Sequence, residues 1–302
     1  MRSVEAHSLD EMKVVVGAAS DTGTVREQNE DAILVETESA ADGSVEQSML
    51  LAVADGMGGY QRGEVASQIA IETLEKEYRG GPLAPTEAPQ RLKRAFLNAN
   101  DLIFRDGSAE GEEHMMGTTL VAAVIQGHDL TIANVGDSRA YLVRANRATQ
   151  VTRDHSLVAE QVAAGAMTEQ EARESQHRNI ITRALGHRQR VDVDVFEIRL
   201  LPEDRLLLTS DGLHDYVDET EMVQAALGRP PEDAARELVN LALQHGSNDN
   251  VSAVIAWMAP AGMPTERVPE AAAARGSMLV PLIVLIGVIV FIAVVVLLLY
   301  LA

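Results

Sequence analysis

Residues 119–144 read TLVAAVIQGHDLTIANVGDSRAYLVR, and this stretch decides the fold class. It contains three runs rich in aliphatic and β-branched residues, at 119–126, 129–135 and 140–144, which are typical of strands. The connections between them are too short for the crossover helix that parallel neighbours require. The three strands are therefore predicted to be antiparallel, in sheets that helices cover.

The rest of the chain adds both strands and helices to this pattern. Apolar residues at helical spacing predict helices over 63–78 and 90–104. Start signals at Thr168, Asp218 and Pro231 predict three more. The predicted fold class is therefore α+β. Further strands are expected at 14–19, 32–36, 49–54, 191–200, 205–209 and 251–258.

The chain divides into a tail at 1–12, a domain at 13–258, a linker at 259–277 and an apolar segment at 278–302. Within the domain, the polar and strand-free segment 154–179 is interpreted as a surface flap. The last segment has no charged residue and is long enough to cross a bilayer as one helix. All lysines and arginines precede it, so the positive-inside rule predicts a single-pass anchor in the cell membrane, with the domain in the cytoplasm.

Composition excludes several classes of function. The chain has no cysteine, which rules out disulfides and thiolate metal sites. Its formal net charge is −20, whereas nucleic-acid binding needs a basic surface, so no nucleic-acid partner is expected.

Four aspartates stand where apolar runs end or begin. They are Asp55 in MLLAVADGMGG, Asp137 in LTIANVGDSRA, Asp211 in RLLLTSDG and Asp249 in SNDNVSAVIAW. Carboxylates that converge at strand ends repel one another unless hard cations such as Mg²⁺ or Mn²⁺ neutralise them. Gly56 lets the backbone turn sharply after the strand and present a carbonyl oxygen to a cation. Taken alone, this Asp-Gly pair is more often an ordinary turn.

A second group of polar residues precedes the strand at 32–36. Arg26 stands just ahead of Glu30 and Asp31, and arginine is the side chain best suited to bidentate capture of phosphate. Taken alone, this segment is better interpreted as a solvated polar loop.

Taken together and in order, these blocks resemble the metal-dependent Ser/Thr protein phosphatases of the PPM (PP2C) family, in particular its bacterial single-domain branch. The resemblance spans about 14–257 and implies an αββα sandwich, in which two antiparallel sheets are flanked by helix pairs, followed here by one C-terminal transmembrane helix. The segments that carry it are SDTGTVREQNEDA (20–32), VADGMGG (53–59), GTTL (117–120), NVGDSRAYL (134–142), TRDHSL (152–157), ITRALG (181–186), LTSDGLHD (208–215) and NDNVS (248–252).

The resemblance also implies a set of metal ligands. Asp55 would bridge two Mn²⁺ or Mg²⁺ ions, and the Gly56 carbonyl would bind one of them. Asp211 and Asp249 would complete the other ion. Asp137 would help to hold a third, weaker ion.

The remaining roles concern the substrate and the surroundings of the ions. Arg26 would grip the substrate phosphate, while Glu30 and Asp31 would bind metal-coordinated waters, with Asn250 beside them. A hydroxide shared by two ions would attack phosphorus in line. Met57 stands where many eukaryotic members have a histidine as general acid, and His155 is interpreted as structural rather than as its replacement.

The predicted function is thus a membrane-tethered protein serine/threonine phosphatase. Its expected partners are phosphorylated proteins at the membrane, such as Ser/Thr kinases or their substrates. Two alternatives stay open: a regulatory or binding module that keeps the fold without turnover, and a phosphatase of small phosphate esters. The first is expected to lose metal-binding acids, and this chain keeps all four.

Overall fold

The computed structural model describes residues 12–38, 48–58, 62–79, 87–109 and 116–260. The elements in chain order are β1 (Lys13–Asp21), β2 (Asp31–Glu38), β3 (Ser48–Gly58), α1 (Gly63–Tyr78), α2 (Ala88–Ala109), β4 (Met116–Thr118), β5 (Leu120–Gln126), β6 (Asp129–Val135), β7 (Arg139–Arg144), β8 (Arg147–Gln150), α3 (Leu157–Ala163), α4 (Glu169–Glu174), β9 (Asp194–Arg199), β10 (Arg205–Thr209), α5 (Asp211–His214), α6 (Glu219–Ala226), α7 (Pro231–Gln244) and β11 (Val251–Ala259).

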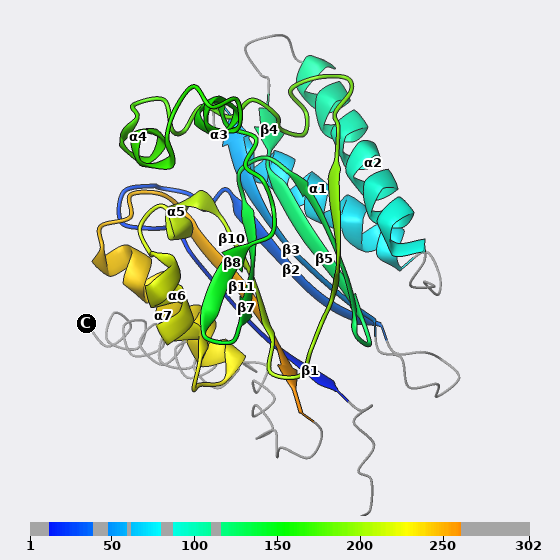
Figure 1. Cartoon of the computed structure of the whole chain (residues 1–302). Coiled ribbons are helices and arrows are strands. Elements are labelled where there is room, and N and C mark those ends of the chain that lie inside the picture. Colours follow the sequence, from blue (N-terminus) through cyan, green and yellow to red (C-terminus); the bar gives the residue numbers. More distant parts are fainter. Residues whose placement is uncertain (1–11, 39–47, 59–61, 80–86, 110–115, 261–302) are drawn as a thin grey trace, which may run out of the picture. The chain divides into compact units, whose positions relative to one another are not determined.

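The strands form two sheets, and all pairings in the described part of the chain are antiparallel. One sheet has five strands in the order β1-β11-β10-β7-β8. The other has six, with β2-β3-β5-β6-β9 in line and β4 paired to β3. The predicted antiparallel arrangement is therefore confirmed (Figure 1).

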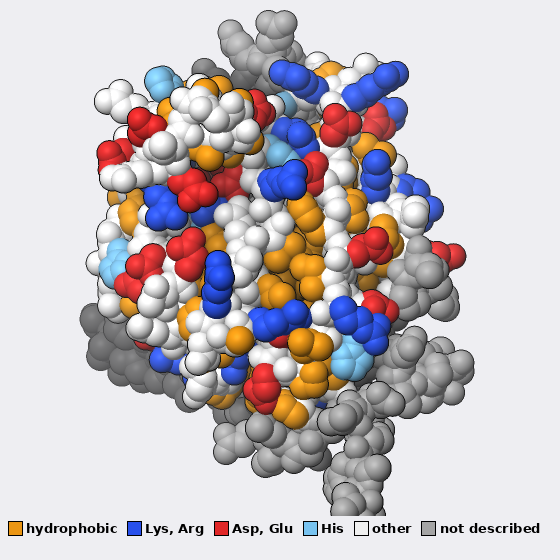
Figure 2. All heavy atoms as spheres, viewed as in Figure 1, with side chains coloured by type: hydrophobic (Ala, Val, Ile, Leu, Met, Phe, Trp, Pro, Cys, Tyr) orange, Lys and Arg blue, Asp and Glu red, His pale blue; other side chains and the backbone are white. Residues whose placement is uncertain are grey.

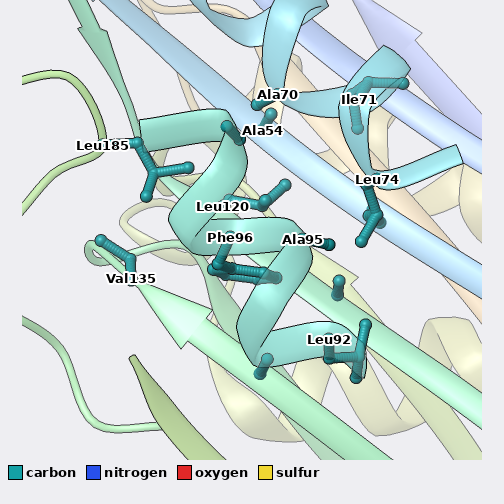
Figure 3. Close-up of a cluster of buried hydrophobic side chains, with 14 of the residues drawn as sticks. Ala54, Ala70, Ile71, Leu74, Leu92, Ala95, Phe96, Leu120, Val135 and Leu185 are labelled. Atoms are coloured by element: carbon teal, nitrogen blue, oxygen red, sulfur yellow. The ribbon is translucent and has the colours of Figure 1, made fainter. Parts of the chain in front are cut away.

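A helix pair covers the outer face of each sheet. Apolar side chains fill the space between each helix pair and its sheet and the space between the two sheets. Helices α1 and α2 pack on the six-stranded sheet, and Figure 3 shows Phe96 of α2 near Leu120 of β5 within this cluster. Helices α6 and α7 pack on the five-stranded sheet in a second cluster, which contains Leu238. A third cluster joins the two sheets. The predicted αββα sandwich is confirmed for the described residues.

Strand β7 does not belong to the same sheet as β5 and β6, the two strands that precede it in the sequence. The run at 140–144 follows β6 closely, yet β7 pairs with β10 and β8 and not with β6. The chain crosses between sheets at Gly136, whose φ of +110° favours glycine and whose added Cβ would lie 2.6 Å from the Thr119 side chain. Asp137 therefore lies at a crossing between the two sheets.

Other differences are smaller. The predictions omitted β4, β8, α3 and α5, and they began β9 three residues before Asp194. Within the described residues, no helix is both long and apolar enough to cross a membrane. The anchor predicted at 278–302 lies outside them, as do residues 1–11 of the predicted tail and 261–277 of the linker.

Candidate metal centre

Two carboxylates come from the six-stranded sheet. Asp31 is the first residue of β2 and stands directly opposite Asp55 of β3 in the antiparallel register. The register is set by the apolar residues of β3, which are fully buried up to Ala54. Like charges directly opposite one another destabilise a sheet, so this pair needs a compensating positive charge.

The prediction that the strand ends at Asp55 was wrong. Strand β3 continues to Gly58, and Gly56 and Gly58 pair with Thr118 and Met116 of β4. Gly56 is needed for close packing and not for a turn, because an added Cβ would lie 2.1 Å from the Gly63 carbonyl oxygen. Asp55 is thus held inside a paired strand and not in a loop.

Three further carboxylates come from outside the strands. Asp211 is separated from the end of β10 by Ser210 alone and begins the short helix α5. Asp249 stands two residues before β11 begins at Val251, and Asp137 stands at the crossing from β6 to β7. In Figure 1, α5 lies at the end of the sandwich that carries the flap helices α3 and α4.

The structure brings these carboxylates together. Burial raises the pKa of Asp55 well above its usual range, and Asp211, Asp31, Asp137 and Asp249 raise it further by repulsion. Burial, followed by the charge of Asp211, raises the pKa of Asp31 to about 7 and that of Asp137 to about 8. The pKa of Asp211 rises to about 6 through burial and the charge of Asp249. Mutual repulsion of this kind is what a bound cation relieves.

Two oxygens in this cluster support the fit to a hard divalent ion. Within the described residues, Oδ1 of Asp31 and Oδ1 of Asp137 are buried and have no hydrogen-bond partner. Buried polar atoms are normally satisfied, so these two lack the partner that a cation would provide. Carboxylate oxygens are also the ligands that Mg²⁺ and Mn²⁺ prefer.

Neighbouring groups occupy the other carboxylate oxygens. No three acidic or histidine side chains in the described ranges are already arranged as ligands around one point. Instead, Arg26 Nη2 lies 2.7 Å from Asp249 Oδ2, and Asp211 shares a hydrogen bond with Asp55. Side chains rotate readily once a cation is present, so the mutual repulsion and the two unpartnered oxygens still fit a cation site.

The segment that carries Arg26 is held by Asn250. Its amide nitrogen donates to the backbone carbonyls of Thr22 and Gln28, at 2.8 and 3.0 Å. Its amide oxygen accepts from the backbone N–H of Glu30 at 2.8 Å. Asn250 therefore fixes the loop that places Arg26 beside Asp249, whereas the sequence predicted only its position near the ions.

Glu30 and Asp31 are held by different partners. Asp31 Oδ2 accepts hydrogen bonds from Ser210 and Ser252, at 2.8 and 2.7 Å. The backbone carbonyl of Glu30 accepts from the Gly56 N–H at 3.1 Å, which ties the loop to β3. Burial raises the pKa of the Glu30 carboxyl despite the nearby charge of Arg26.

One acid in this region received no role from the sequence. Asp215 closes α5 four residues after Asp211, burial raises its pKa, and its Oδ2 lies 3.5 Å from Arg178 Nε of the flap. Asp211 and Asp215 are four residues apart in LTSDGLHD, so both acids lie on one face of the helix. This spacing is the sequence signal from which the proximity of Asp215 to Asp211 could have been predicted.

The contacts of His155 support its structural interpretation. The ring is buried, and its Nδ1 accepts from the Gly136 N–H at 2.9 Å. Its own backbone N–H donates to the Gly136 carbonyl at 3.0 Å. His155 therefore holds Gly136, the residue before Asp137, by two hydrogen bonds. Its Nδ1 accepts one of them and is not available as a proton donor.

Comparisons with known proteins show the family that this chain resembles. The family model described as Protein phosphatase 2C matches residues 16–161. The serine/threonine phosphatase stp of Listeria welshimeri is 35% identical over 243 residues, which are 78% of this chain and 92% of that protein. The serine/threonine protein phosphatase PstP of Mycobacterium tuberculosis is 37% identical over 79% of this chain and 44% of its own length.

Solved structures extend the likeness to the fold. The crystal structure of Mycobacterium tuberculosis PstP/Ppp has a TM-score of 0.71 at 35% identity and covers 82% of this chain and 99% of that one. Staphylococcus aureus Stp1 has a TM-score of 0.75 at 35% identity, with coverages of 84% and 99%. A PstP catalytic domain in complex with two manganese ions has a TM-score of 0.71 at 35% identity and coverages of 82% and 100%.

The chain belongs to the protein phosphatase 2C family. It is a metal-dependent enzyme of the protein-serine/threonine phosphatase class.

Proposed function

We propose that this chain hydrolyses phosphoserine and phosphothreonine in proteins with two Mn²⁺ or Mg²⁺ ions and acts while tethered to the membrane. The observation that carries the proposal is the buried carboxylate cluster, whose members raise one another's pKa and include two oxygens without partners. A binding module without turnover has no need of such a cluster, which costs stability when no cation is present.

Asp55, Asp211 and Asp249 would hold the two main ions, together with the Gly56 carbonyl. Asp137 would contribute to a third, weaker ion, which its buried and unpartnered Oδ1 supports. When bound, such ions supply Lewis-acid chemistry and lower the pKa of water.

Arg26 is the group placed to bind the substrate phosphate. Its side chain is 49% exposed, and Asn250 holds the loop that carries it. A guanidinium presents a fork of donors that matches two phosphate oxygens. Arg26 pairs with Asp249 in the structure, so its move from carboxylate to phosphate would accompany the binding of a cation by Asp249.

Other residues keep the carboxylates in place. The Asp55 N–H donates to Thr119 Oγ1 at 3.0 Å, and Thr118 Oγ1 donates to the Asp55 carbonyl at 2.9 Å. Ser210 and Ser252 orient Asp31. Met57 has no acidic proton to give, so protonation of the leaving oxygen does not come from this position.

The tether rests on the sequence of 278–302, which is apolar and uncharged. A short anchor and linker would raise the effective concentration of the domain near phosphorylated membrane proteins, such as Ser/Thr kinases or their targets. Fractionation of cells that express the full chain, or the chain without 278–302, tests this: only the full chain is expected in the membrane fraction.

The enzyme proposal is tested with the full chain, a phosphothreonine peptide and an aryl phosphate. We expect hydrolysis with Mn²⁺, loss of hydrolysis with a chelator, and a loss of at least about 100-fold in Asp211→Asn. Asp233→Asn, an exposed acid on α7, is the matched control and should keep full activity. Full activity of Asp211→Asn, or hydrolysis of the aryl phosphate alone, would contradict the proposal, and the second result would favour a small-ester phosphatase.

A further inference from the structure

A second polar site lies at the foot of the flap. A cavity of about 430 Å³ opens between Glu160 of α3 and the segment 181–192, which leads from α4 to β9. Figure 2 shows basic side chains near the top of this face, where Figure 1 places that segment. None of the metal-site carboxylates lines the cavity, so it is a separate feature of the surface.

The lining is more basic than the rest of the chain. It contains three guanidinium groups, from Arg183, Arg188 and Arg190, against two carboxylates, from Glu160 and Asp192, in a chain with a net charge of −20. The Glu160 carboxylate already accepts a hydrogen bond from Thr182 Oγ1 at 2.7 Å. A local excess of positive charge on an acidic protein favours an anionic ligand.

Two of these arginines are available to a ligand. Arg183 is paired with Asp194, with Nη1 2.9 Å from Oδ1. Arg188 and Arg190 are exposed, and neither makes an ion pair with any of the described residues. Their guanidinium groups therefore keep donors that can bind phosphate or carboxylate oxygens.

The backbone that carries the arginines is held firmly. Asn100, buried on α2, accepts from the Gly186 N–H at 3.0 Å and donates to the Arg188 carbonyl at 3.0 Å. The His187 ring packs so closely on Gly117 that an added Cβ there would lie 2.8 Å from the ring. A ligand would thus meet arginines on an ordered backbone, and less ordering entropy would be lost on binding.

The cavity is connected to the metal centre by short contacts. Arg183 Nη1 lies 2.9 Å from His155 Nε2, and His155 clamps Gly136, the residue before Asp137. On the same segment, Leu185 pairs with Thr118, whose hydroxyl donates to the carbonyl of Asp55. These contacts place the segment that lines the cavity next to the residues that hold Asp55 and Asp137.

We propose that the cavity is a second anion subsite, which binds a further phosphorylated or acidic side chain of the same protein substrate through Arg188 and Arg190. This inference rests on the proposed function, because it requires a protein substrate at the metal centre. It predicts a preference for substrates with a second negative group at a defined spacing from the phosphothreonine.

The experiment compares phosphothreonine peptides in which a glutamate or a phosphoserine is placed two to five residues away on either side. An extended chain of that length covers about 7–17 Å. With the wild-type full chain and Mn²⁺, we expect kcat/KM to rise about tenfold at one spacing, mainly through a lower KM. A rise with phosphoserine alone identifies the ligand as a phosphoryl group, and an equal rise with glutamate identifies it as any carboxylate-sized anion.

The double variant Arg188→Gln/Arg190→Gln should lose this preference and keep wild-type activity on an aryl phosphate, which is too small to reach the cavity. The matched control is Arg147→Gln/Arg173→Gln, which removes two exposed arginines outside the lining and should keep the preference. A wild type that is active but indifferent to the second group, or a control that loses the preference equally, overturns the subsite alone. A wild type inactive on every substrate contradicts the proposed function and the subsite with it.

Discussion

The two sheets supply carboxylates to one site in different ways. In the six-stranded sheet, Asp31 and Asp55 belong to paired strands and stand opposite one another in the ladder. In the other half, Asp211 and Asp249 lie outside the ladder, on a short helix and in a turn. Asp249 is 34% exposed and paired with Arg26, whereas Asp55 is held within a paired strand. We infer that the six-stranded sheet forms a rigid platform and that the five-stranded half carries carboxylates able to adjust.

The largest expected difference between the two halves is in the effect of aspartate substitutions on phosphatase activity. We expect Asp55→Asn to lower kcat/KM by about 1000-fold at every Mn²⁺ concentration, because no neighbour can take its place in the ladder. Asp249→Asn should weaken the apparent Mn²⁺ affinity by roughly 10–100-fold and recover in part at high Mn²⁺. Steady-state kinetics across a Mn²⁺ titration measures both. Recovery of Asp55→Asn but not of Asp249→Asn would reverse the assignment of platform and adjustable half.

Core substitutions in the two halves are expected to lower the free energy of unfolding by similar amounts. Phe96→Ala, beneath the six-stranded sheet, should lower the free energy of unfolding by about 3–5 kcal/mol, and Leu238→Ala, beneath the other sheet, by about 2–5 kcal/mol. Leu97→Ala on the same helix α2 is the control, since Leu97 is 40% exposed, and should change it by less than about 0.5 kcal/mol.

Because a third apolar cluster joins the sheets, each variant should shift a single urea transition. Two separate transitions, only one of which moves with each substitution, would mean that the halves unfold independently.

The smallest predicted effect is the pH dependence of the metal-free chain. The pKa values of Asp211, Asp31 and Asp137 are raised to about 6, 7 and 8, whereas the same groups in an unfolded chain titrate near 3.9. Between about pH 4 and pH 8 the folded chain holds protons that the unfolded chain has lost, so stability falls as pH rises through this window. Thermal melts in chelator should show Tm falling by several degrees from pH 5 to pH 8.

Saturating Mn²⁺ should remove most of this decline, because the cation replaces the protons as the compensating charge. Asp31→Asn should make the decline shallower without Mn²⁺. A melting temperature that does not change with pH in chelator would contradict the close approach of the carboxylates.

The four aspartates proposed as ligands and the antiparallel fold class were both read from local sequence pattern, and the structure confirms the fold class. Apolar runs identify strands, and a carboxylate beside such a run lies near the edge of a sheet. The pattern did not identify the sheet to which β7 belongs, since strand pairing depends on contacts between segments distant in sequence. For the same reason the ladder position of Asp55 and the loop-holding role of Asn250 were not predicted.

The sequence by itself therefore determined most of the long strands and helices, the candidate acidic residues and the family resemblance, because these depend on residue identity and short-range spacing. Only the tertiary structure decided that Asp31 and Asp55 face one another, that Arg26 pairs with Asp249, and that Glu160 of α3 lines one cavity with the segment 181–192. Those outcomes depend on packing and register, which bring together side chains more than 200 positions apart, as with Arg26 and Asp249.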